Sequence, residues 1–84
     1  MIVRDIEMDV EKYSLAYELI SKNFAGPLIE TYPRGKTLFR DFLYDKMGCS
    51  FLEAEELVDA LEKNGKISFA RFQRRKRFGE WRIG

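Results

Sequence analysis

The 84-residue sequence contains no histidine, only one cysteine and no long apolar run. Histidine is the side chain that most often moves protons near neutral pH, and it is a common ligand of transition metals. A glycine-rich phosphate loop and a nucleophile-elbow motif are also missing. These absences argue against an enzyme, and we expect a protein that uses neither a metal nor another cofactor.

The single cysteine, Cys49, cannot form a disulfide within the chain. A lone thiol without metal-ligating neighbours is typical of a reducing compartment. No segment has the length and apolarity of a membrane span, and charges interrupt the first residues, which therefore do not resemble a signal peptide. We expect a cytoplasmic protein that makes no contact with a membrane.

The composition that remains is that of a folded domain. Apolar residues make up 45% of the chain, and seven phenylalanines, four tyrosines and one tryptophan supply much packing surface for so short a sequence. A chain of this length is sufficient for one hydrophobic core and too short for two. We therefore expect residues 1–84 to form a single domain.

The pattern of apolar residues predicts an α+β fold in which three helices precede a C-terminal β-hairpin. Asp9 and Thr37 are the expected N-caps of the first two helices, and Gly35 belongs to an expected turn. The predicted elements are a possible short strand over 1–8, helices over 10–23, 37–47 and 51–63, an extended stretch over 28–32, a turn over 33–35, and hairpin strands over 66–72 and 78–83.

The third helix has the clearest signals. Ser50 and Glu53 have the spacing of a capping box, in which two side chains satisfy free amides of the first turn. Asn64 and Gly65 are suited to ending the helix. Between these signals runs an inner apolar stripe of Ala54, Leu57, Val58 and Leu61.

The first helix carries more apolar residues than one buried face requires. Leu15 and Leu19 lie well around the helix from the face formed by Tyr13, Tyr17 and Ile20. This second face either is covered by another part of the chain or forms an interface with a partner or a second copy.

The order of elements resembles that of the winged helix-turn-helix family over roughly residues 9–83. The most specific part is the stripe Ala54-x-x-Leu57-Val58-x-x-Leu61, which runs into Asn64-Gly65 and the first hairpin strand. The resemblance implies DNA binding and a role in transcription regulation, with helix 51–63 as the recognition helix and loop 73–77 as the wing tip. The same scaffold also serves as a protein-docking module.

Charge is distributed very unevenly along the chain. Residues 1–65 carry eight Lys and Arg against thirteen Asp and Glu, a net charge of −5, whereas residues 66–84 carry seven against one, a net charge of +6. Such a cationic end favours phosphate binding and counterion release, hence DNA or RNA as a partner. The candidate nucleic-acid-binding residues are Arg71, Arg74, Arg75, Lys76, Arg77 and Arg82.

The third helix argues against the usual major-groove contact. Its stripe turns Glu55, Glu56 and Asp59 outward, where carboxylates would face phosphates. Two hypotheses follow. In the first, the basic hairpin binds nucleic acid and the acidic helix faces away. Phe72 and Phe78, on either side of the loop, would then stack on exposed bases. Their commoner role in a hairpin is to pack across the strands. In the second, the domain binds a protein or itself through an interface of Leu15, Leu19, Glu55, Glu56 and Asp59.

Overall fold

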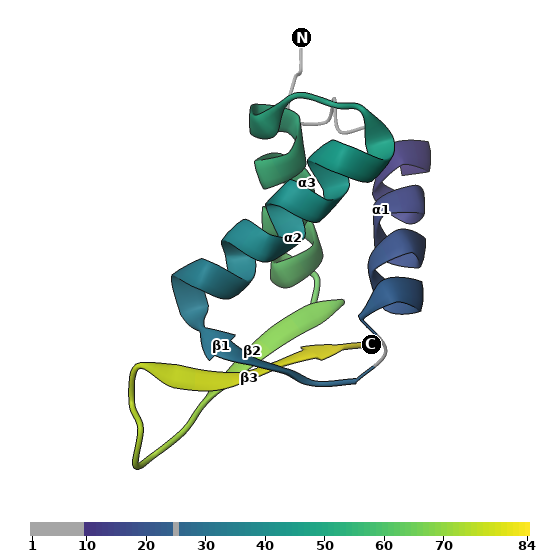
Figure 1. Cartoon of the computed structure of the whole chain (residues 1–84). Helices are drawn as coiled ribbons and strands as arrows, with labels where there is room; N and C mark the ends of the chain where they lie inside the picture. Colours follow the sequence, from purple (N-terminus) through teal and green to yellow (C-terminus); the bar gives the residue numbers. More distant parts are fainter. Residues whose placement is uncertain (1–9, 25) are drawn as a thin grey trace, which may run out of the picture.

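The computed structural model describes residues 10–24 and 26–84, and it confirms the α+β architecture. Three helices lie on one side of an antiparallel sheet (Figure 1). The expected short strand over 1–8 and the expected cap Asp9 lie outside the described residues. The elements are α1 (Val10–Asn23), β1 (Leu28–Thr31), α2 (Tyr32–Met47), α3 (Phe51–Lys63), β2 (Ile67–Arg71) and β3 (Phe78–Ile83).

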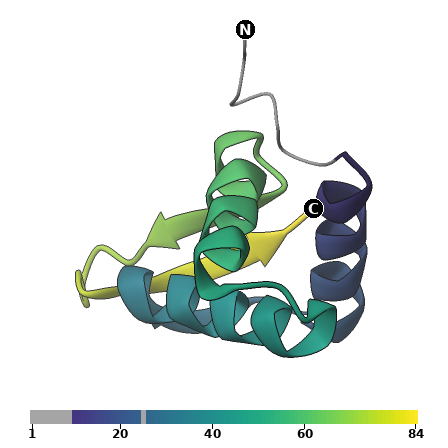
Figure 2. The ribbon, with the colours of Figure 1, turned by 90° about the horizontal axis from the view of Figure 1, so that it is seen from above.

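The sheet has three strands in the order β1-β3-β2, with β3 in the centre. Leu28 of β1 and Phe69 of β2 both lie opposite Trp81 of β3. The stretch predicted as extended therefore joins the hairpin as an edge strand. Seen from above (Figure 2), the helices cover the sheet, while the loop between β2 and β3 extends beyond them.

The core lies between the helices and the sheet, and Trp81 is its largest buried side chain. The indole stacks on Tyr32 at a centroid distance of 5.3 Å and meets the edge of Phe39 at 5.4 Å. All four residues of the predicted α3 stripe are buried as well. Among the described residues, no helix is long and apolar enough to cross a membrane.

The predicted beginning of the second helix is wrong. α2 begins at Tyr32, and Thr31, rather than Thr37, is its N-cap, with its hydroxyl accepting the Arg34 N–H at 3.3 Å. Pro33 lies in the first turn, where its missing N–H costs no hydrogen bond. Gly35 does not form a turn; it is buried in the helix, and an added Cβ would lie 2.0 Å from Trp81 Nε1. Its role is to allow the indole to approach α2.

α3 begins and ends as predicted. The Ser50 hydroxyl accepts the Glu53 N–H at 3.0 Å, and Gly65 adopts a left-handed φ of 76° after the helix. The Glu53 carboxylate pairs with Lys12 of α1 at 2.6 Å, which ties the beginnings of these two helices together. One half of the expected capping box is therefore present, and the Glu53 side chain joins α3 to α1.

Candidate nucleic-acid interface

The loop over residues 73–77, here called the basic loop, is shaped by its own backbone. The Phe72 N–H donates to the Phe78 carbonyl at 2.9 Å, and the Phe78 N–H donates to the Arg75 carbonyl at 2.8 Å. The Arg71 guanidinium donates to the carbonyl of Lys76 across the loop. Backbone hydrogen bonds and the Arg71 side chain therefore hold the loop in this form.

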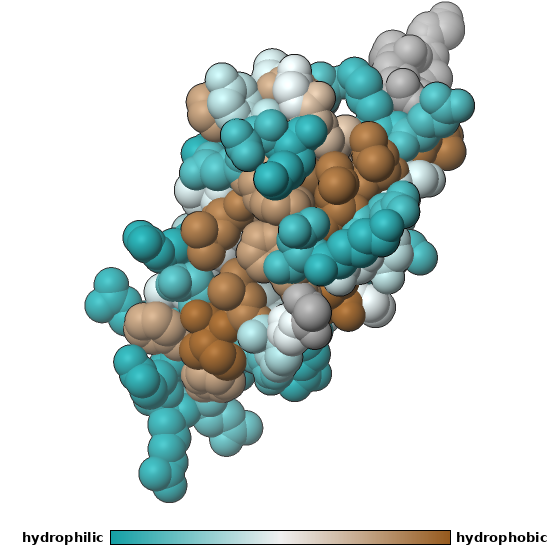
Figure 3. All heavy atoms as spheres, turned by 45° about the vertical axis from the view of Figure 1, so that its right-hand side comes forward, coloured by the Kyte–Doolittle hydropathy of each residue, from teal (hydrophilic) through white to brown (hydrophobic). Residues whose placement is uncertain are grey.

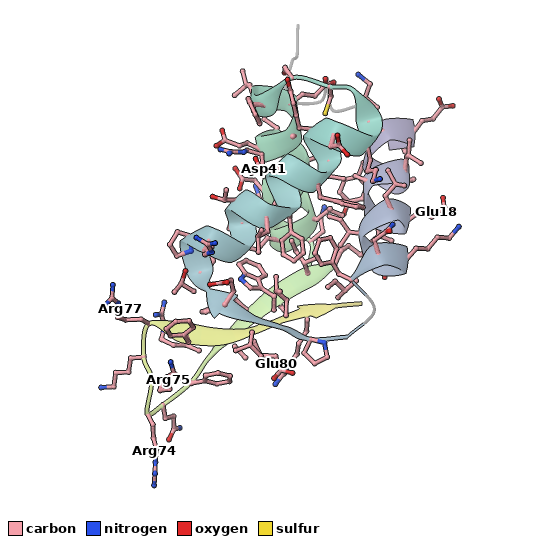
Figure 4. The ribbon with its side chains drawn as sticks, viewed as in Figure 1. Glu18, Asp41, Arg74, Arg75, Arg77 and Glu80 are labelled. Carbon is pink, nitrogen blue, oxygen red and sulfur yellow. The ribbon has the colours of Figure 1, made fainter. Side chains whose placement is uncertain are left out.

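The four cations of the basic loop are exposed. Among the described residues, no carboxylate lies within ion-pair distance of Arg74, Arg75, Lys76 or Arg77. Figure 4 shows the side chains of Arg74 and Arg77 pointing away from the body of the protein. The Arg75 guanidinium lies over the Phe78 ring, 4.8 Å from its centroid. Figure 3 shows hydrophilic side chains projecting from this end of the molecule.

The other two predicted phosphate-binding residues lie in different surroundings. Arg71 is exposed at the end of β2, where it braces the basic loop and lies over the Phe69 ring. Arg82 lies near the other end of β3, opposite Ser68, and pairs with Glu80 at 3.2 Å. The fold therefore groups Arg71 with the basic loop and places Arg82 apart from it.

The outward acidic side chains of α3 behave differently from the basic loop. Glu55, Glu56 and Asp59 are exposed, as predicted. Two of them meet cations of α2, since Lys36 hydrogen-bonds to Asp59 and Arg40 lies 3.6 Å from Glu55. Lys36 also bonds to Glu62 at 3.1 Å. We call this set of Lys36, Arg40, Glu55, Asp59 and Glu62 the α2–α3 seam.

The pKa values in the α2–α3 seam reflect this pairing. Burial lowers the pKa of the Lys36 ammonium, but the hydrogen bonds to Asp59 and Glu62 outweigh burial and raise its pKa to about 12. The Tyr32 hydroxyl donates to Glu62 at 2.9 Å, and burial together with this bond raises the pKa of Tyr32. Lys36 therefore stays positively charged although most of its side chain is buried.

The sequence did not reveal this seam, because the second helix was expected to begin at Thr37 and therefore to exclude Lys36. With the helix beginning at Tyr32, Lys36 and Arg40 are four residues apart and share one helical face. Thr31 followed by Pro33 is a readable helix start, because threonine is a good N-cap and proline is favoured in the first turn. That signal places both cations on one face of the helix, whereas the contact of this face with α3 depends on how the two helices pack.

The second face of α1 is only partly covered. Ala16 and Ile20 are buried against the rest of the domain, whereas Leu15 is 44% exposed and Leu19 is half-buried. A second exposed apolar group lies at the α2–α3 turn, where Tyr44 and Phe51 stack at 4.0 Å between centroids. Neither group adjoins the basic loop in the chain.

Within residues 10–24 and 26–84, the structure brings no three acidic or cysteine side chains into an arrangement that could hold a metal ion. The chain matches no protein-family model, and neither the curated proteins nor the solved structures provide a similar protein. The case for this interface therefore rests on the charges and contacts of the chain itself.

Proposed function

We propose that this protein is a non-enzymatic nucleic-acid-binding module that holds the phosphate backbone with its basic loop. The observation that carries the proposal is the set of four consecutive exposed cations without a carboxylate partner among the described residues. Cations gathered on one projection attract polyanions and release the counterions of phosphates on binding. Arg71 supports the loop from β2.

The order of elements supports the winged-helix resemblance, in which the basic loop is the wing tip and α3 the recognition helix. Base readout in the major groove leans on Arg, Lys, Asn and Gln, whereas the outward face of α3 presents Glu55, Glu56 and Asp59. We infer that the loop makes the main contact and that α3 faces away. A regulatory role in the cytoplasm, acting on DNA or RNA, completes the proposal.

A binding titration with matched variants tests this function. The full chain, a loop variant (Arg74, Arg75, Lys76 and Arg77 to Ala) and a control variant (Lys22, Lys46, Lys63 and Lys66 to Ala) are each titrated against labelled oligonucleotides at about 50 mM salt. Both variants lower the formal net charge from +1 to −3. Counterion release from four contacts predicts an affinity loss of about 100-fold or more for the loop variant and little loss for the control.

Absence of binding by the wild-type chain at low salt, or equal losses in the two variants, would overturn the proposal. Equal losses would mean that overall charge, rather than the basic loop, governs the interaction. Thermal unfolding of each variant checks that the domain is intact before affinities are compared.

A protein-interaction module is the second candidate, and the exposure of Leu15 favours it. Its interface would combine Leu15 and Leu19 with the acidic residues Glu55, Glu56 and Asp59. Light scattering across a range of concentrations tests self-association: a concentration-dependent dimer that Leu15→Glu abolishes supports this candidate. A monomer at every concentration contradicts the self-association form of it.

A further inference from the structure

The sheet has an outer face that the helices do not cover. Trp81 and Ile67 point into the core, so the alternate positions of the same strands point the other way. Glu80 is one of them, and Figure 4 shows its side chain directed away from the helices. By the strand register, the outer face also carries Ile29, Ser68, Ala70 and Arg82.

Two phenylalanines continue this outer face to the base of the basic loop. Phe78 begins β3 and has the same alternation as Glu80 and Arg82. Phe72 follows β2 directly and is joined to Phe78 by the backbone hydrogen bond that closes the loop. Both side chains are partly exposed, and four cations separate them in the sequence.

Neither of these rings belongs to the core. Phe39 is fully buried, and Phe24, Phe42 and Phe69 pack against the core cluster, whereas Phe72 and Phe78 do not. Among the described residues, neither Phe72 nor Phe78 forms a ring pair with another aromatic side chain. The expected packing of Phe72 and Phe78 across the strands stays a prediction. The Arg75 guanidinium over Phe78 is the ring contact at this site.

We propose that the outer face of the sheet, where it reaches the basic loop, binds single-stranded nucleic acid together with that loop. Bases stack on Phe72 and Phe78, and the loop cations hold the phosphates. This inference rests on the proposed function and specifies its substrate. In a duplex, the base faces are already covered by their neighbours, whereas the unstacked bases of a single strand are free to lie on aromatic rings. The rings of Phe72 and Phe78 thus form a stacking platform. The Arg75 guanidinium extends this platform, because arginine also stacks on planar groups.

The position of the acidic residues agrees with this choice of substrate. Glu55, Glu56 and Asp59 belong to α3, in the helical layer, while Phe72 and Phe78 belong to the hairpin. A single strand lying along the outer end of the sheet meets the basic loop without passing the acidic helix. Glu80, paired with Arg82, bounds the platform on the side away from the loop.

Fluorescence anisotropy with three labelled probes tests the inference on the full chain. The probes are oligothymidylate of about 12 nucleotides, an abasic strand of the same length, and a duplex. Since stacking on one aromatic ring contributes about 5- to 150-fold in affinity, wild type is expected to bind oligothymidylate at least about 10-fold more tightly than the abasic strand. Phe72→Leu with Phe78→Leu should remove that preference and leave the abasic affinity and the salt slope unchanged.

Two further variants make the test specific. Phe72→Tyr with Phe78→Tyr keeps stacking rings and should bind as wild type does, which also covers the case in which the leucine variant is unstable. Phe51→Leu changes an exposed ring at the opposite end of α3 from the sheet, and no change in affinity is expected.

The outcomes separate the inference from the proposed function. Equal affinity of wild type for oligothymidylate and the abasic strand, or full affinity in the leucine variant, overturns base stacking while a loop-dependent salt effect still supports phosphate binding. Tighter binding of the duplex than of the single strand also overturns the inference. If wild type binds none of the probes, the proposed function and this inference both fail.

Discussion

The α2–α3 seam and the basic loop contain similar numbers of charges and use them in opposite ways. In the seam, Lys36 and Arg40 each meet carboxylates of α3. In the basic loop, Arg74, Arg75, Lys76 and Arg77 meet no carboxylate of the described chain. One set of charges joins two helices, and the other is the set that we propose to bind phosphates.

This difference shows why net charge is a poor guide to what a small domain binds. The formal net charge of +1 would suggest no preference for anions. Opposite charges that pair within the fold offset one another locally, and salt screens the exposed remainder over about 10 Å. In our proposal, a polyanion meets the local charge of the loop, which forms no ion pair within the described residues. Changes in the packed part should therefore appear in stability, and changes in the loop should appear in binding.

The largest expected effect on stability comes from Gly35→Ala. The new Cβ would lie 2.0 Å from Trp81 Nε1, so the indole or α2 has to move. Overpacking of this kind costs about 1–3 kcal/mol, and the central place of Trp81 favours the upper end. Urea unfolding measures the loss, and a variant as stable as wild type would contradict the assigned role of Gly35. Gly26→Ala, where an added Cβ meets nothing within 4 Å, is the control.

Lys36→Met should have a smaller effect and one that depends on pH. The Lys36 side chain is only 23% exposed and has two acidic partners, so we expect a loss of about 1 kcal/mol, more than most surface pairs provide. Because its folded pKa of about 12 exceeds the unfolded value near 10.4, the contribution is fully present below the unfolded pKa and falls as pH rises through about 12.

The measurement for Lys36→Met is urea unfolding of both proteins at several pH values between 7 and about 10, where Lys36 stays charged in wild type. The gap in unfolding free energy should be constant over that range. A gap that vanishes by pH 9 would contradict the pairing. Binding of oligonucleotides by this variant should match wild type, because the seam is not the proposed contact.

Ser50→Ala should have an effect on stability no larger than that of Lys36→Met. Loss of the hydroxyl that accepts the Glu53 N–H should lower the free energy of unfolding by about 1 kcal/mol, the usual value for an N-cap. Thermal or urea unfolding measures this change, and Ser50→Asp, which retains a capping oxygen, should restore most of it. An unchanged stability in Ser50→Ala would show that the cap contributes nothing.

The fold was predictable where the signals are local. α3 and the hairpin follow from a cap, an alternating pattern and a stop, all within a few residues. The beginning of α2 was not predicted, because Pro33 and Gly35 were interpreted as turn residues. Gly35 is required by its contact with Trp81, which is 46 positions away in the sequence, and no local pattern carries that information.

The candidate site was likewise predictable where its residues are adjacent in the sequence, and not where their contacts depend on packing. The four loop cations are adjacent in the sequence, so their grouping was predictable, and Arg71 follows from its place at the end of β2. Arg82 was grouped with them by closeness in sequence, but the extended strand carries it away from the loop to Glu80. The pairing of Lys36 with Asp59 joins residues 23 positions apart and depends on how two helices pack.

The most direct test of the central claim is the slope of log affinity against log salt for oligothymidylate binding by wild type, the loop variant and the control variant. Four phosphate contacts on a single strand contribute a slope of about −2.8. We predict that the loop variant loses about that much of the wild-type slope, whereas the control variant, with the same net charge, retains it. Equal slopes for wild type and the loop variant would contradict the claim that the unpaired loop cations hold the phosphates.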